Sequence, residues 1–68
     1  MRTFSPTGDY IELNKLLKAS GLLGSGGEAN AVISDGRVKV NGETESRKRR
    51  KLRGGDVVGF DGEKVSIT

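Results

Sequence analysis

The sequence predicts a single α+β domain in which two short helices pack as a hairpin against a small, mainly antiparallel sheet. Leucines recur at helical spacing in the first third of the chain, and alternating segments joined by Asn-Gly and Asp-Gly dipeptides follow in the second half. A length of 68 residues allows one hydrophobic core and no second one. We therefore expect residues 1–68 to form one domain, with residues 1–9 as an N-terminal arm.

The first helix is predicted near residues 13–20. Three leucines recur there at helical spacing, namely Leu13, Leu16 and Leu17. Gly21 stands where a residue in the left-handed conformation commonly ends a helix. The alternation of apolar and polar residues from Tyr10 onward indicates a short strand just before this helix.

The second helix is expected to begin at a Ser-x-x-Glu capping box, formed by Ser25 and Glu28, and to end at Gly36. Its buried stripe consists of Ala29, Val32 and Ile33. Because the connection between the helices is short, we expect them to pack as an αα-hairpin.

Strands are expected after the helices. Residues 37–40 alternate strictly and lead into Asn41-Gly42, a strong signal for a two-residue hairpin turn. The return segment, residues 43–46, is polar on both faces and is expected to be an edge strand or a loop.

The last hairpin has a clearer pattern. A two-residue turn at Asp61-Gly62 would place Val58 opposite Val65, with Phe60 on the same side. Leu52, the one apolar residue in a basic segment, is expected to attach that segment to the core.

Positive charge is concentrated in one part of the chain. The net charge is +3, but residues 31–54 carry eight basic groups against three acidic ones, a net charge of +5. Six of those basic groups form what we call the basic run: Arg47, Lys48, Arg49, Arg50, Lys51 and Arg53. Such a density predicts either a solvated loop or a contact with a polyanion such as RNA or DNA.

The types of side chain present indicate which kind of polyanion the basic run would bind. Only Phe4, Tyr10 and Phe60 are aromatic, so base stacking is not expected to dominate the binding of nucleic acid. Contacts of Arg and Lys with phosphates favour the recognition of RNA shape over RNA sequence. If the basic run is extended, one side presents Arg47, Arg49, Lys51 and Arg53, and Lys48 and Arg50 flank Leu52. Arg37 and Lys39 either extend this surface or form the solvent side of their strand.

Catalytic and metal sites are not expected. The chain has no cysteine and no histidine, which excludes disulfides, thiolate nucleophiles and the commonest zinc ligands. Turn chemistry and solubility explain the candidate carboxylates, which are Glu43, Glu45, Asp56, Asp61 and Glu63. The chain carries no apolar run of membrane-spanning length and no secretory signal, so we expect a cytoplasmic protein that is not an enzyme and has no cofactor.

Residues 12–58 contain a series of motifs in a fixed order. They are Leu13-x-x-Leu16, Gly21, Ser25, Ala29, Ile33, Gly36-x-Val38-x-Val40-Asn41-Gly42 and Leu52-x-x-Gly55-Asp56-x-Val58. In this order they resemble the RNA-binding domain of small-subunit ribosomal protein S four. The sequence Ser-Gly-Gly-Glu-Ala at residues 25–29 and the basic run before Leu52 are similar to the stand-alone bacterial members, the YbcJ-like proteins. The resemblance implies an αL-type two-helix motif and a shallow basic surface for structured RNA.

The chain departs from the family pattern at three places. Gly26 stands where the family often has an arginine near RNA phosphate, Asn30 where the stand-alone members tend to have lysine, and the basic run where proline is common. The backbone N–H groups at Ser25, Gly26 and Gly27 could bind a phosphate, or the glycines could merely allow a tight entry between packed helices.

The resemblance therefore implies a non-catalytic protein that binds structured RNA, ribosomal RNA above all, in ribosome assembly or translation quality control. We expect a monomer with no membrane or small-molecule partner. An adaptor whose basic run binds an acidic protein is the alternative. A minimal nuclease that loses cleavage when Asp56 is replaced is a third hypothesis.

Overall fold

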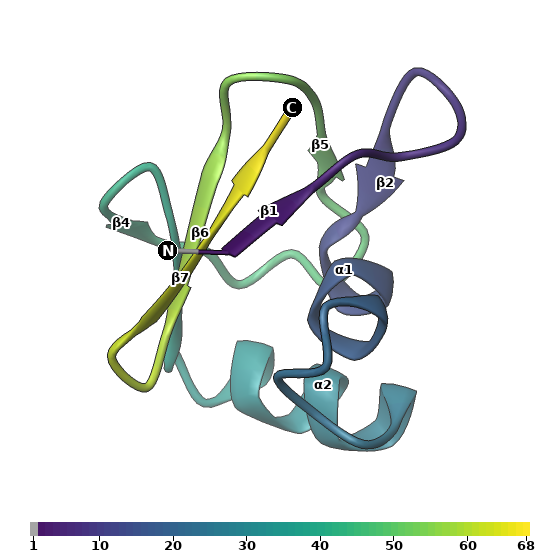
Figure 1. The fold of residues 1–68 in the computed structure, drawn as a ribbon. Coiled ribbons are helices and arrows are strands. Elements are labelled where there is room, and N and C mark those ends of the chain that lie inside the picture. The colour runs from purple at the N-terminus through teal and green to yellow at the C-terminus, as the bar shows by residue number, and fades with distance from the viewer. Residues whose placement is uncertain (1) are drawn as a thin grey trace.

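Seven strands and two helices make up the computed structural model, which describes residues 2–68. Figure 1 shows both helices on one side of a five-stranded sheet, with a two-stranded sheet beside the start of α1. The elements in chain order are β1 (Arg2–Phe4), β2 (Ile11–Glu12), α1 (Leu13–Ala19), α2 (Gly26–Ser34), β3 (Val38–Val40), β4 (Glu43–Thr44), β5 (Lys51–Leu52), β6 (Val57–Phe60) and β7 (Glu63–Ile67). The predicted α+β class and mainly antiparallel sheet are confirmed.

The predicted first helix is confirmed as α1. Its three leucines are fully buried, and Ser20 forms its C-cap. Gly21 follows in the left-handed region with φ +82°, as its position predicted. The guanidinium of Arg2 donates a hydrogen bond of 2.9 Å to the carbonyl oxygen of Ser20, which ties the end of α1 to β1.

The start of α2 is also close to the prediction. The Ser25 hydroxyl accepts a hydrogen bond from the backbone N–H of Glu28 at 3.2 Å. The Glu28 carboxylate accepts a hydrogen bond from the same hydroxyl at 3.4 Å. The second contact of the capping box is therefore made between the two side chains. The two helices pack as a hairpin, and the amide of Asn14 donates to that of Asn30 across them at 3.2 Å.

The five-stranded sheet has the order β1-β7-β6-β3-β4. Both predicted two-residue turns are present, because Asn41-Gly42 and Asp61-Gly62 each have two consecutive positive φ angles, the signature of a type I′ turn. Val58 pairs with Val65 and both are buried with Phe60, as the pattern predicted. The apolar side chains of this sheet and of the two helices form a single core.

The N-terminal arm differs from the prediction. Residues 2–4 form β1, which pairs in parallel with β7, so that Phe4 lies beside Ile67 in the sheet register and packs against the core. The backbone N–H of Thr68 donates to the carbonyl of Phe4 at 3.0 Å. The sequence did not indicate this strand because it is three residues long and its partner lies at the other end of the chain.

Neither helix in residues 2–68 combines the length and the apolar character needed to cross a membrane.

Candidate nucleic-acid interface

The basic run is folded into a turn, not extended throughout as its alternating sides would require. The backbone N–H of Arg50 donates to the carbonyl of Arg47 at 3.3 Å, and only Lys51 and Leu52 enter a strand, β5. β5 pairs with β2, and Leu52 is fully buried, which confirms its predicted role as an anchor. The condition under which alternate cations would share one side, an extended run, is therefore not met before residue 51.

The start of α1 determines the shape of the basic run. A helix leaves its first N–H groups without partners, and the side chain of Glu12, the N-cap residue of α1, does not cap them. Instead, the N–H of Leu13 donates to the carbonyl of Arg50 at 2.9 Å, and the N–H of Asn14 donates to that of Lys48 at 3.0 Å. The backbone of the basic run thus caps the helix, and the helix holds the run in place.

Glu45 fixes the basic run from the other side. Its carboxylate accepts hydrogen bonds from the backbone N–H of Arg47 at 2.9 Å, from the Arg47 guanidinium at 3.1 Å and from the Arg50 guanidinium at 2.9 Å. Hydrogen bonds from Arg47 and then Arg50 lower the pKa of Glu45 to about 2, so it is ionised at neutral pH. The expectation that Glu45 is a solvated surface group is wrong, because the residue is only 7% exposed.

A second carboxylate, that of Glu12, positions Arg49. Arg49 has the most exposed arginine side chain among the four ion pairs in residues 2–68. Glu12 Oε2 lies 3.3 Å from Arg49 Nε, and Glu12 Oε1 lies 3.4 Å from Lys15 Nζ. The Arg49 side chain is still 79% exposed. Its guanidinium is therefore oriented by one contact and open to solvent over most of its surface.

The far end of the basic run lies against an aromatic ring. Lys51 Nζ is 4.9 Å from the centroid of the Tyr10 ring, and Arg53 Cζ is 5.7 Å from it, distances typical of cation–π contacts.

The carboxylate of Asp56 accepts from the backbone N–H of Arg53 at 2.9 Å and from the Asn41 amide at 3.0 Å. These two hydrogen bonds lower the pKa of Asp56 and fit the predicted turn role of Gly55-Asp56.

Three shallow hollows adjoin at Arg49, and we call them together the Arg49 surface. The first is lined by Arg47, Arg49, Arg50, Lys51 and Arg53. The second is lined by Tyr10, Ile11, Glu12, Lys15 and Arg49. The third is lined by Glu12, Asn14, Lys15, Asn30, Ser46, Lys48 and Arg49. The fold therefore gathers all six cations of the basic run on one surface, together with residues from α1, α2 and the segment before β2.

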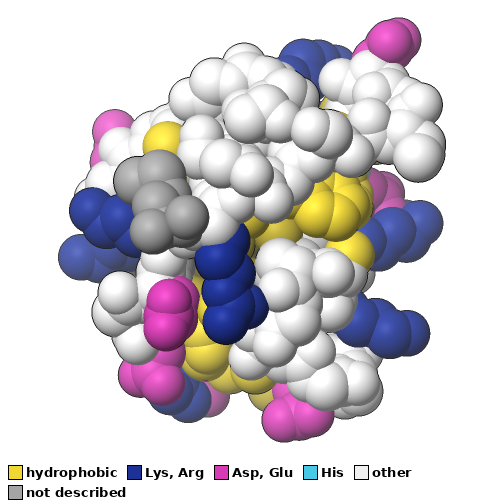
Figure 2. Space-filling model, viewed as in Figure 1, with side chains coloured by type: hydrophobic (Ala, Val, Ile, Leu, Met, Phe, Trp, Pro, Cys, Tyr) yellow, Lys and Arg dark blue, Asp and Glu magenta, His cyan; other side chains and the backbone are white. Residues whose placement is uncertain are grey.

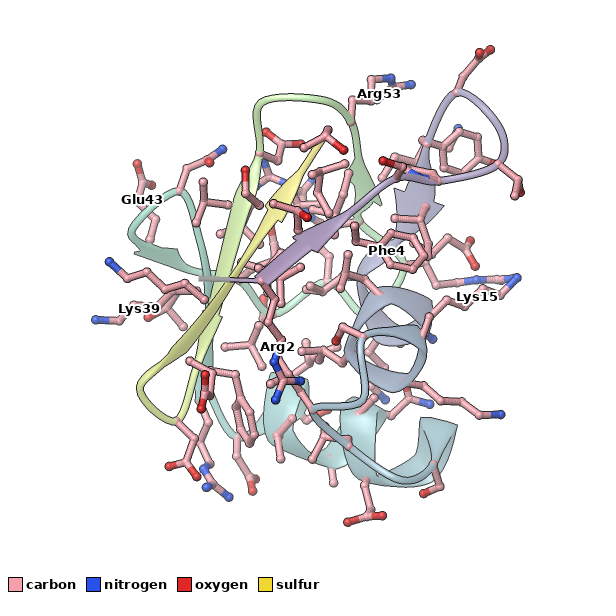
Figure 3. The ribbon with its side chains drawn as sticks, viewed as in Figure 1. Arg2, Phe4, Lys15, Lys39, Glu43 and Arg53 are labelled. Carbon is pink, nitrogen blue, oxygen red and sulfur yellow. The ribbon has the colours of Figure 1, made fainter. Side chains whose placement is uncertain are left out.

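Arg37 and Lys39 lie elsewhere. Arg37 Cζ is 5.3 Å from the centroid of the Phe60 ring, and the hollows that these two residues line contain Lys64 and no member of the basic run. In Figure 3 the side chains of Lys39 and Lys15 point to opposite sides of the molecule. Figure 2 shows basic side chains at both margins of this face and a further one near its middle, close to an acidic side chain.

Ser25, Gly26 and Gly27 occupy the cap and first turn of α2, as expected. No side chain or distant backbone lies within 4 Å of a Cβ built on Gly26, so this backbone is open to an approaching group. The Glu28 carboxylate, however, lies at this helix end and contacts the Ser25 hydroxyl. An anion at Gly26 would meet that negative charge.

Several residues of the Arg49 surface are not evident as site residues from the sequence. Tyr10, Asn14, Lys15 and Asn30 join the basic run only because β2, α1 and α2 fold beside it. The sequence did contain one indication of Asn30, because this asparagine stands where the stand-alone members of the family tend to have lysine. Tyr10 had an indication as well, since it is one of only three aromatic residues in the chain. Within residues 2–68 no three acidic side chains are grouped as a metal site would require.

Comparisons with known proteins give the same fold. The S4 domain family model matches residues 4–68. YbcJ of Escherichia coli (strain K12) is 43% identical over 58 residues, which cover 85% of this chain and 83% of YbcJ. The Bacillus subtilis (strain 168) protein named "Probable ribosome maturation protein RlbA" is 41% identical over 54 residues, 79% of this chain and 76% of RlbA.

Two solved structures extend the comparison. The solution structure of Escherichia coli YbcJ, described as revealing an αL motif involved in RNA-binding, superposes with a TM-score of 0.76 at 42% identity over 100% of this chain and 87% of YbcJ. The 30S ribosomal protein S4e from Thermoplasma acidophilum gives a TM-score of 0.63 at 26% identity, over 85% of this chain and 31% of that protein. The αL-type helix pair expected from the sequence is thus confirmed, and the chain belongs to the S4 domain family.

Proposed function

We infer that this protein binds structured RNA through the Arg49 surface and does not act as an enzyme. The observation that carries the inference is the gathering of six cations on one surface whose hollows are shallow and adjoin at Arg49. A broad cationic surface suits the phosphates of folded RNA, whereas a small-molecule substrate requires a deeper and more apolar cavity. The description of YbcJ as containing a motif involved in RNA-binding supports the same function.

The proposed RNA is ribosomal, and the proposed role is in ribosome assembly or translation quality control. Two relatives support this choice, since one carries the name of a ribosome maturation protein and another is a ribosomal protein of the 30S subunit. The protein is proposed to act as a monomer.

The contacts are proposed to fall into two groups. Lys48 and Arg49 bind phosphates directly, because Lys48 forms no ion pair in residues 2–68 and the Arg49 guanidinium is mostly exposed. Arg47 and Arg50 contribute charge while they hold Glu45. Phosphate binding by Ser25, Gly26 and Gly27, and an extension of the surface to Arg37 and Lys39, stay predictions of the sequence.

The test is fluorescence anisotropy with structured ribosomal RNA fragments, matched duplex DNA and single-stranded RNA across a salt series. We expect a preference for structured RNA and a steep loss of affinity with salt, because each neutralised phosphate releases a counterion. The double variant Lys48→Glu/Arg49→Glu should weaken binding on the order of a hundredfold. Arg50 is left intact because its replacement would also remove a partner of Glu45.

The control is Lys64→Glu, a single charge reversal on β7, outside the Arg49 surface. Equal, weak binding to every polyanion would contradict the proposal, and so would unchanged binding by the double variant. In a pull-down from cell extract, a partner that survives RNase treatment would identify the adaptor alternative instead.

A further inference from the structure

Tyr10 has a large aromatic ring that is not part of the hydrophobic core. It is 41% exposed and is the one exposed large hydrophobic side chain in residues 2–68. The half-buried apolar side chains that pack against the core are Phe4, Ile11, Leu22 and Leu23, and Tyr10 is not among them. Burial therefore does not account for an aromatic residue at this position.

The surroundings of Tyr10 are cationic on the side of the basic run. Lys51 Nζ lies 4.9 Å and Arg53 Cζ 5.7 Å from the ring centroid. Tyr10 also lines a hollow together with Lys15 and Arg49. Lys51 and Arg53 lie over the ring and cover part of it, so a group that stacks on Tyr10 would take the part that they leave exposed. Four basic side chains can reach groups bound there.

The one carboxylate that lines this hollow does not oppose an anion strongly. It belongs to Glu12, which pairs with Arg49 at 3.3 Å and with Lys15 at 3.4 Å. These two cations outweigh its charge, so the hollow beside Tyr10 has a net positive character.

A nucleotide supplies both complements of this arrangement. Its phosphate pairs with lysine and arginine, and its base stacks on an aromatic ring, which is how proteins bind unpaired nucleotides. A base inside a continuous duplex has both faces covered by its neighbours and cannot stack on Tyr10. We propose that the RNA bound at the Arg49 surface presents an unpaired nucleotide, as a bulge or in a loop beside a helix, whose base stacks on Tyr10. This inference rests on the proposed function and specifies the class of RNA.

The test compares two RNAs in anisotropy titrations, a continuous duplex and the same duplex with one bulged nucleotide. Wild-type protein should prefer the bulged RNA by about tenfold, a difference typical of one base stacked on an aromatic side chain. Tyr10→Phe retains the ring and should retain the preference. Tyr10→Leu should bind both RNAs as the wild type binds the duplex, with the same salt dependence, and Lys64→Ala serves as the surface control.

A second measurement does not depend on a variant that folds. Tyr10 is the only tyrosine of the chain, so its ring resonances in the NMR spectrum belong to one residue. We expect them to shift upfield on addition of the bulged RNA and to move little with the duplex, because a stacked base shields the ring protons.

The possible outcomes distinguish a failure of base stacking on Tyr10 from a failure of the proposed RNA binding. A preference for bulged RNA that persists in Tyr10→Leu, or ring resonances that stay in place while RNA binds, would overturn the stacking inference and leave RNA binding intact. Absence of salt-dependent binding to either RNA would overturn the proposed function and this inference with it.

Discussion

The basic run and the outer face of the sheet carry the same kind of charge but hold it differently. In the basic run, Glu45 and Glu12 pair with three of the arginines, and the backbone is bound to the start of α1. On the sheet, Lys39 and Lys64 lie in register on either side of Gly59 and take part in none of the ion pairs of residues 2–68. Carboxylates inside a cationic surface can therefore give that surface its shape, which the number of cations alone does not do.

The largest effect is expected from removal of the side chain that anchors the basic run to the core. Leu52→Ala should lower the free energy of unfolding by about 3 kcal/mol, because it removes a fully buried leucine from the core. Urea denaturation followed by circular dichroism measures this, with Lys51→Ala, an exposed neighbour in the same strand, as control. A loss below about 1 kcal/mol would mean that the run is not held by Leu52.

Replacement of Glu45 is expected to have a smaller effect on stability, and to change RNA affinity in the direction opposite to that expected from charge alone. Glu45→Gln removes a negative charge from a surface proposed to bind RNA, which by charge alone should strengthen binding. We expect weaker binding instead, together with a loss of about 2 kcal/mol in stability, since Arg47 and Arg50 lose the carboxylate that orders them. Tighter RNA binding by this variant would show that Glu45 does not position the run.

The same carboxylate predicts a dependence of stability on pH. Its pKa is about 2 in the fold against an ordinary value of 4.5, so its contribution is present above pH 4.5 and is lost as the pH falls toward 2. Unfolding measured across that range should lose less stability with acidification in Glu45→Gln than in the wild type. Parallel profiles would contradict this account.

The smallest effects are expected from the replacement of one exposed cation in each of the two regions. Arg49→Ala should weaken RNA binding by about tenfold and reduce the salt slope by about one phosphate contact. Lys39→Ala should change affinity by less than about threefold, because Lys39 projects from the opposite side of the molecule to Lys15. Equal losses in the two single variants would mean that RNA contacts both regions.

Local features of the fold could be predicted from the sequence because local chemistry determines them. The turn at Asn41-Gly42 requires two positive φ angles, which asparagine and glycine adopt at low cost, and the buried stripes of the helices repeat within a few residues. β1 could not be predicted, since Arg2 and its partner Val65 are brought together by the whole fold.

The candidate site follows the same division. The six cations of the basic run are evident in the sequence, but their arrangement is not. An isolated polar segment gives no sign that Glu45 is buried or that the carbonyls of Lys48 and Arg50 cap a helix that begins 35 residues earlier at Leu13. Tyr10 joins the site for the same reason, through the pairing of β2 with β5.

The caps on α1 also determine when the surface comes into existence. The N–H groups of Leu13 and Asn14 find their acceptors only after a loop of more than thirty residues has closed, a contact of long sequence separation that is expected to form late in folding. A nascent or partly unfolded chain therefore carries the cations without the surface. The hydrogen-exchange rates of these two amides report how much of the population has a complete Arg49 surface at any moment.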